Sequence, residues 1–157
     1  MEWKEFLFNE IFNIEKGFYN NKPKGSGNLP FISATKENNG ISDYLDKNNV
    51  KKTHKGNCLT VVNDGNSMGE TFYQENEFTS SHSINVLRLK NITLNKYIAM
   101  FLILLIRNEN YRFNYGRKWR IERMRYTKIK LPILKNGSPN WQFMEDYIKS
   151  LPYSSNL

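Results

Sequence analysis

Residues 59–73 read LTVVNDGNSMGETFY: a β-rich run that ends in two valines, a loop, and a second β-rich run. Valine, threonine and aromatic residues favour strands, whereas asparagine, aspartate and glycine favour turns. We therefore expect a strand over residues 57–62, a loop over residues 63–69, and a further short strand that starts at Thr71.

Short extended segments flank this unit on both sides. Residues 3–14 are mixed apolar and predict a short strand followed by a helical turn, and residues 29–34 and 84–89 predict strands. The intervening stretches 20–28 (NNKPKGSGN) and 36–42 (KENNGIS) are rich in turn residues, and the second contains the turn dipeptide Asn-Gly.

The chain then becomes helical. Residues 98–106 (IAMFLILLI) are apolar nearly all round, which predicts a buried helix, with Thr93 or Asn95 as its N-cap. Residues 126–134 alternate apolar residues with lysines, as a half-exposed strand does. Ser138-Pro139 can open a last helix, whose apolar stripe comprises Trp141, Met144, Ile148 and Leu151.

This order of elements predicts an α+β fold: a single compact domain over residues 1–157, with a mixed β-sheet region, a buried helix and a C-terminal helix. The start of the chain lacks a signal-peptide layout, and the longest apolar run is about half of what a bilayer span needs. We therefore expect a cytoplasmic protein without a membrane partner.

Charge is the first indication of function. The 157 residues contain 23 Lys and Arg against 15 Asp and Glu, a formal net charge of +8. Nearly all of the excess lies in residues 99–157, mostly between Arg107 and Lys130. A localised positive excess favours a polyanionic partner, most often nucleic acid, although a solvated basic face without a partner fits the charge alone.

Motifs that would carry catalysis are scarce. The sequence contains no GxSxG nucleophile elbow, no P-loop, no glycine-rich cofactor loop and no spaced carboxylate set for a metal ion. Cys58 lies in an apolar run, so we expect it in the core. His54 lies between lysines and is expected to be exposed, and we expect a structural role for His82. We expect no catalytic residue, metal ligand or cofactor.

Binding residues are better indicated. Residues 111–120 (YRFNYGRKWR) interleave aromatic residues with cations. Arginine binds phosphates and guanine edges bidentately, aromatic rings pack on sugars or bases, and asparagine amides suit adenine edges. Asparagine is equally a turn residue, and Trp119 is expected to be partly core. The candidate DNA-binding residues are Lys22, Lys24, Lys36, Asn38, Asn39, Arg112, Tyr115, Arg117, Lys118, Arg120 and Arg123.

Taken in order, these segments resemble a known family. They comprise the opening FLFNEIFNIEKG over residues 6–17, LPFISA over residues 29–34, NGISDY over residues 39–44, the central run quoted above, FTSSHSINVL over residues 78–87, YGR over residues 115–117 and TKIKLP over residues 127–132. Over nearly its whole length the chain resembles the target recognition domain of restriction-modification specificity subunits, of Type I and related systems.

The resemblance implies a DNA-reading module that has no catalysis of its own. It further implies a partner DNA methyltransferase, commonly one that acts on adenine N6, and a nuclease subunit in restriction complexes. A full specificity subunit has two such domains separated by long helices, whereas this chain has one. A half-subunit that pairs with a second copy, a domain of a longer polypeptide and a stand-alone relative all fit.

Within such a module, we expect the basic stretch, residues 107–130, to contact phosphates and loop side chains to read bases. Lys118 and Arg123 are the predicted phosphate contacts, and Arg117 or Arg120 is the predicted base-reading residue. Two alternatives stay open: a small metal-dependent nuclease, and an interaction module that regulates a restriction complex. The positive net charge argues against the second of these as a DNA mimic, because a mimic should be acidic.

Overall fold

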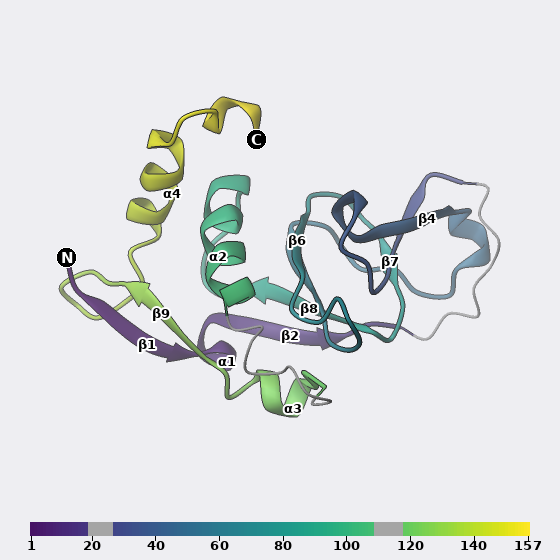
Figure 1. Ribbon diagram of the computed structural model, residues 1–157, viewed down its shortest axis with the longest axis horizontal. Helices are drawn as coiled ribbons and strands as arrows, with labels where there is room; N and C mark the ends of the chain where they lie inside the picture. The colour runs from purple at the N-terminus through teal and green to yellow at the C-terminus, as the bar shows by residue number, and fades with distance from the viewer. Residues whose placement is uncertain (19–26, 109–117) are drawn as a thin grey trace.

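The computed structural model describes residues 1–18, 27–108 and 118–157, and Figure 1 shows their arrangement. The strands are β1 (Trp3–Leu7), β2 (Phe12–Lys16), β3 (Leu29–Ile32), β4 (Ile41–Leu45), β5 (Cys58–Val62), β6 (Thr71–Gln74), β7 (Thr79–Ser80), β8 (Ile84–Leu89) and β9 (Lys128–Pro132). The α-helices are α1 (Phe8–Ile11), α2 (Lys96–Asn108), α3 (Ile121–Met124) and α4 (Trp141–Ser150), and short 3-10 turns lie at Asn38–Gly40, Lys47–Asn49 and Ser154–Asn156.

The strands form three sheets that follow one another along the long axis of the molecule (Figure 1). An antiparallel sheet of order β2-β8-β5-β6 lies in the middle. A small sheet of order β4-β3-β7, in which β3 and β7 run parallel, lies at one end, and the antiparallel pair β1-β9 lies at the other. Helices α2 and α4 pack against each other beside β1 and β9.

Two apolar clusters hold these layers together. The larger one joins α1, α2 and α4 to the inward faces of β1, β9 and the central sheet. At its centre the Phe8 ring lies 5.6 Å from Phe12 and 5.7 Å from Trp119, in edge-on and tilted geometries that aromatic pairs favour. The smaller cluster lies between the central and the small sheet and comprises Ile32, Cys58, Val62, Phe78, Ile84 and Val86.

The predicted α+β class, with mixed sheets, an inner helix and a C-terminal helix, is confirmed. Asn95 is the cap of α2, because its side-chain oxygen accepts hydrogen bonds from the backbone N–H groups of Tyr97 and Ile98 at 3.0 and 2.9 Å. In β9 the predicted alternation holds: Ile129 and Leu131 are buried and the lysines between them are exposed.

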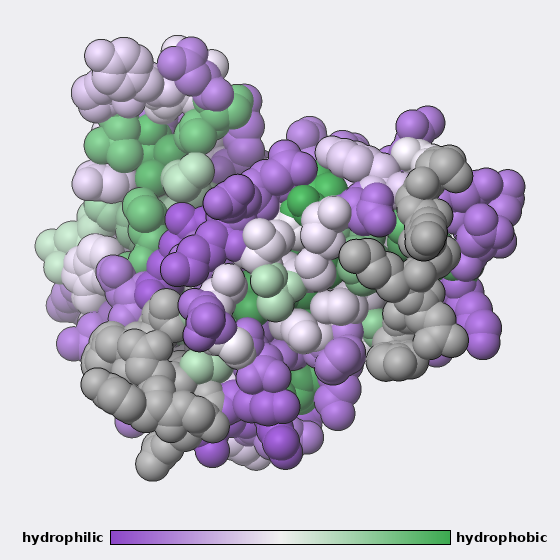
Figure 2. Space-filling view, turned by 45° about the vertical axis from the view of Figure 1, so that its right-hand side comes forward, coloured by the Kyte–Doolittle hydropathy of each residue, from purple (hydrophilic) through white to green (hydrophobic). Residues whose placement is uncertain are grey.

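The prediction that α2 is buried nearly all round is wrong in part. Leu102 is fully buried, but the side chain of Leu104 on the same helix is 50% exposed. The helix packs on β6 and β9 with one part of its surface and on α4 with another, so a third stripe faces solvent. Apolar side chains are accordingly visible at the surface of the lobe formed by α2 and α4 (Figure 2).

The expected exposure of His54 is also wrong. Its backbone pairs with Phe78, and its ring is buried between the rings of Phe18, at 4.0 Å, and Phe78, at 5.0 Å. The neighbouring Lys52 and Lys55 are exposed, as their sequence pattern indicates. Successive side chains of an extended segment point to opposite sides, so His54 turns inward while the adjacent Lys55 faces water.

Burial makes His54 sensitive to protonation. Its Nδ1 lies 3.4 Å from Glu15 Oε2, and its Nε2 is hydrogen-bonded to the Ser80 hydroxyl at 3.2 Å. Loss of solvent lowers the pKa of His54; Glu15 opposes this shift and Arg88, which donates to Glu15 at 2.9 Å, adds to it. The folded state therefore favours the neutral ring.

Two leucines of α2 give a matched test of the core. Leu102→Ala removes a fully buried side chain and is expected to lower the free energy of unfolding by about 2–5 kcal/mol. Leu104→Ala, at the exposed stripe, is expected to change it by about 1 kcal/mol or less. Urea denaturation of both variants measures the difference, and equal losses would contradict this placement of α2.

Stability should also depend on pH through His54. As pH falls below about 6.5, the unfolded chain takes up the proton first, because the pKa is lower in the folded state. The contribution of neutral His54 is thus complete above that pH and is lost progressively below it. Melting temperatures between about pH 7.5 and 5 should show a flatter profile for His54→Gln than for wild type, and equal slopes would contradict this role of His54.

Candidate nucleic-acid interface

The described part of the basic stretch, residues 118–130, has an inner and an outer face. Trp119, Ile121, Met124 and Thr127 are buried, and α3 forms one helical turn in the middle of the stretch. The cations all lie on the exposed side; they are Lys118, Arg120, Arg123, Arg125, Lys128 and Lys130. The predicted Arg112, Tyr115 and Arg117 lie outside the described residues.

Trp119 fixes this stretch to the central sheet. Its ring is fully buried, and its indole Nε1–H donates to the Thr127 hydroxyl at 3.0 Å. Its backbone N–H donates to the carbonyl of Asn63 at 2.9 Å, and its own carbonyl accepts from the side-chain amide of Asn85 at 2.9 Å. The predicted core position of Trp119 is confirmed.

Asn85 is the centre of this network, and the sequence reasoning missed it. It is a buried residue of β8 whose side-chain oxygen accepts from Asn63 Nδ2 at 3.0 Å, while Asn63 Nδ2 also reaches the carbonyl of His82 at 3.2 Å. A polar residue inside the apolar strand INVLRL was the available signal, because buried amides need hydrogen-bond partners.

Most of the cations around α3 lack an acidic partner. Among the described residues, ion pairs join Lys118 to Asp64 at 3.1 Å and Lys128 to Glu5 at 3.8 Å. None is formed by Arg120, Arg123 or Arg125 within the described ranges. The surface around α3 therefore carries uncompensated positive charge in water, which a polyanion can neutralise.

The other predicted residues lie elsewhere. Lys36, Asn38 and Asn39 precede β4, and Lys22 and Lys24 lie outside the described residues. Figure 1 shows β4 in the small sheet at one end of the molecule, whereas α3 lies below the central sheet. Both asparagines have positive φ angles, +50° and +56°, and donate from their side chains to backbone carbonyls, Asn38 to Ile41 and Asn39 to Tyr73. Their amide N–H groups thus stabilise the turn, whereas Lys36 is simply exposed.

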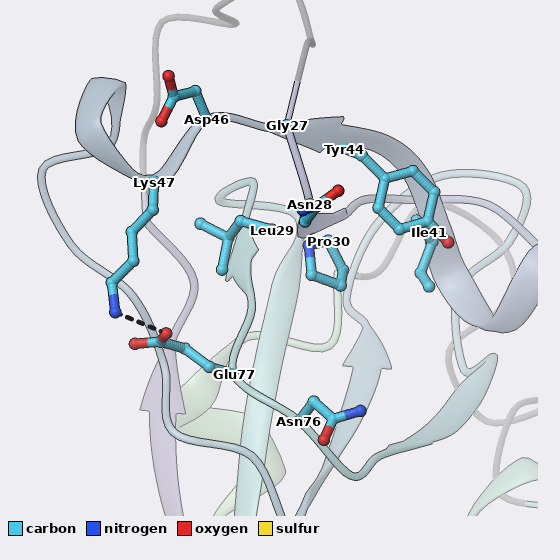
Figure 3. Close-up of a pocket in the computed structure, with 10 residues that line it drawn as sticks. All are labelled: Gly27, Asn28, Leu29, Pro30, Ile41, Tyr44, Asp46, Lys47, Asn76 and Glu77. Carbon is cyan, nitrogen blue, oxygen red and sulfur yellow. Dashed lines mark hydrogen bonds and ion pairs between the residues drawn. The ribbon is translucent and has the colours of Figure 1, made fainter.

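A pocket of about 860 Å³ lies at the small sheet (Figure 3). Its walls include the ring of Tyr44, the amides of Asn28 and Asn76, and an ion pair of 2.8 Å between Lys47 and Glu77. Hydrogen bonds from Lys47 and Thr53 lower the pKa of Glu77. Among the candidate residues that the structure describes, none lines this pocket.

Within residues 1–18, 27–108 and 118–157 no three His, Cys, Asp or Glu side chains are grouped as a metal site would require. Cys58 is buried, as predicted, and loss of solvent raises the pKa of its thiol to about 12, which suppresses the reactive thiolate. None of the helices in these ranges is long and apolar enough to cross a membrane.

Comparison with known proteins places the chain in a family. The profile of the Type I restriction modification DNA specificity domain matches residues 1–152, so the chain belongs to this family. It is 35% identical over 149 residues to the specificity subunit S.BcgI of a Type II restriction enzyme from Heyndrickxia coagulans, a match that covers 94% of this chain and 43% of that protein.

Solved structures of specificity subunits share the fold. The S subunit of a Type I restriction-modification system from M. genitalium matches 98% of the chain with a TM-score of 0.66 at 15% identity, and the chain covers 43% of that protein. The HsdS subunit from Thermoanaerobacter tengcongensis matches 98% with a TM-score of 0.68 at 11% identity, and 41% of it is covered. The chain thus spans about two fifths of the length of these relatives.

The amide network around Trp119 gives a stability prediction. Asn85→Ala removes the donor to the Trp119 carbonyl and the acceptor of an Asn63 amide N–H, and is expected to lower the free energy of unfolding by about 1–3 kcal/mol. Hydrogen exchange should become faster at the backbone N–H of Trp119 in particular. Asn9→Ala serves as the control at a half-buried asparagine outside the network, and slow exchange at Trp119 in the Asn85 variant would contradict the anchoring role.

Proposed function

We propose that this chain is a sequence-specific reader of double-stranded DNA, and that it acts without catalysis as a module of a restriction-modification system. The observation that carries the proposal is the anchored basic stretch: Trp119 and Asn85 fix it to the central sheet, and Arg120, Arg123 and Arg125 are exposed with no acidic partner among the described residues. Membership of the DNA specificity domain family supports it.

The proposed contacts with DNA are of two kinds, contacts to phosphates and contacts to bases. Exposed cations around α3 neutralise phosphates, which sets the register of the protein on the duplex but is indifferent to sequence. Bases are read by side chains that enter a groove, and Arg117 and the turn with Lys36, Asn38 and Asn39 are the candidates. Asn39 Nδ2 donates to both Tyr73 and Gln74, so Asn39 would read a base through its side-chain oxygen, as an acceptor. Asn38 donates one N–H to Ile41 and retains a second N–H beside its oxygen.

The module is proposed to comprise residues 1–157 as one target recognition domain that positions a DNA methyltransferase, commonly one for adenine, and a nuclease subunit. The relatives that support this role are specificity subunits, and one solved neighbour concerns complex assembly of the Type I system. Since those relatives are more than twice as long, we further propose that a second recognition unit, either a second copy or another domain, reads the other part of the site.

The decisive experiment is selection of bound sites from a random duplex library, followed by sequencing. A reader should enrich a motif of a few base pairs. Recovery of the library without enrichment would refute sequence-specific reading. Plasmid incubated with the protein and magnesium ions should remain intact, and cleavage would instead support a nuclease.

Salt dependence tests the electrostatic part. If about five phosphates are neutralised, the slope of log affinity against log salt concentration should be about −4.5. Arg123→Ala should make this slope shallower by about 1 and weaken cognate and scrambled duplexes alike, whereas Arg117→Ala should cost about 1–3 kcal/mol on the cognate duplex only. A flat salt response of the wild type would remove the basic stretch from the proposal.

A further inference from the structure

A cleft of about 320 Å³ lies where the basic stretch meets the central sheet. Three chain segments of the sheet converge there: the end of β2, the loop after β5 and the turn before β8. Residues 118–122 form the remaining wall. The lining residues are Lys16, Gly17, Asn63, Asp64, His82, Asn85, Lys118, Arg120, Ile121 and Glu122.

The register of the sheet directs Lys16 toward the basic stretch. Lys16 is the last residue of β2 and lies directly opposite Asn85 in β8. Residues that face each other across antiparallel strands project from the same side of the sheet. The Asn85 side chain donates to the Trp119 carbonyl, so this side of the sheet faces the basic stretch. Lys16 therefore projects toward the segment that contains Arg120, the residue after Trp119.

The floor of the cleft is fixed before any ligand arrives. The amides of Asn63 and Asn85 are bound to each other and to Trp119 and His82. On the β2 side, the Gly17 N–H donates to the Ile84 carbonyl at 2.7 Å, and a Cβ at Gly17 would collide with that carbonyl. Only glycine therefore lets the end of β2 approach this closely.

The charged residues that line the cleft favour an anion as its ligand. Of the two carboxylates, Asp64 is ion-paired with Lys118 at 3.1 Å, so these charges largely cancel. Lys16 and Arg120 are exposed and form no ion pair with any described residue, which leaves two cations against Glu122. A cation on each of two walls of the cleft suits a compact, charged group such as a phosphate.

We propose that Lys16 and Arg120 clamp one backbone phosphate of bound DNA in this cleft. The proposal rests on the proposed DNA recognition and deepens it, since it adds a contact from the first part of the chain. It also assigns Arg120 to the phosphate backbone, which leaves Arg117 as the arginine expected to read a base. A phosphate bound by both the central sheet and the basic stretch would fix the register of the duplex relative to both parts of the protein.

The test measures binding of a fluorescein-labelled duplex by anisotropy at several salt concentrations. Lys16→Ala and Arg120→Ala should each weaken binding roughly 5- to 10-fold at 0.1 M salt and reduce the salt slope by about 0.9, equally for cognate and scrambled duplexes. Because both cations serve one phosphate, the double variant should lose little more than either single variant. Lys16→Arg, which keeps the charge, should retain affinity.

Lys135→Ala is the charge-matched control, because this exposed lysine lies in the turn between β9 and α4. Wild-type affinity in Lys16→Ala, with an unchanged melting temperature, would overturn the clamp but leave DNA recognition in place. Additive losses in the double variant would assign the cations to separate phosphates and overturn it likewise. The proposed function itself is refuted by a different result, a site selection in which the wild type enriches no motif.

Inorganic phosphate separates a DNA contact from a site for free anions. At constant ionic strength it should leave the wild-type melting temperature unchanged, because a single phosphate lacks the neighbouring contacts of a duplex. A saturable rise in the wild type that is absent in Lys16→Ala would overturn the assignment to DNA.

Discussion

The surface around α3 depends on the hydrogen bond from Asn85 to the carbonyl of Trp119. Through it, a residue of the central sheet holds a segment more than thirty positions later in the chain. Burial makes this hydrogen bond important for stability, because a buried amide that binds neither water nor a protein group raises the free energy of the folded state. Alternative positions of the basic stretch, which would break the bond, are therefore disfavoured. The indole ring adds apolar burial against Phe8 and so ties the stretch to the larger core as well.

This anchoring explains how a positively charged segment remains ordered against a small protein core. Charge repulsion among Arg120, Arg123 and Arg125 opposes their close spacing, and no described carboxylate pairs with them. The buried side chains of Ile121 and Met124 between them offset that cost. The resulting surface is anchored by buried side chains and carries excess positive charge, a combination that suits the binding of a polyanion.

Local sequence patterns were sufficient for most elements. The alternation of residues 126–134 predicted β9, and the polar residues before the apolar run limited the cap of α2 to Thr93 or Asn95, because both signals are set by neighbours along the chain. Patterns failed where another segment decides exposure. Leu104 sits within an unbroken apolar run yet faces water, since α4, β6 and β9 cover only part of α2. His54 is buried among aromatic rings although lysines surround it in sequence.

The sequence by itself determined the α+β class, the family resemblance and the location of the excess charge, because composition, periodicity and motif order are properties of the chain alone. The tertiary structure alone decided which charges act together. Lys16 and Arg120 are separated by about a hundred residues, and strand register brings them to one cleft. It also showed that both asparagine side chains make structural hydrogen bonds: Asn38 donates to Ile41 within its own turn, and Asn39 donates to Tyr73 of the distant strand β6. Pairing between strands is a long-range property, and no local pattern specifies it.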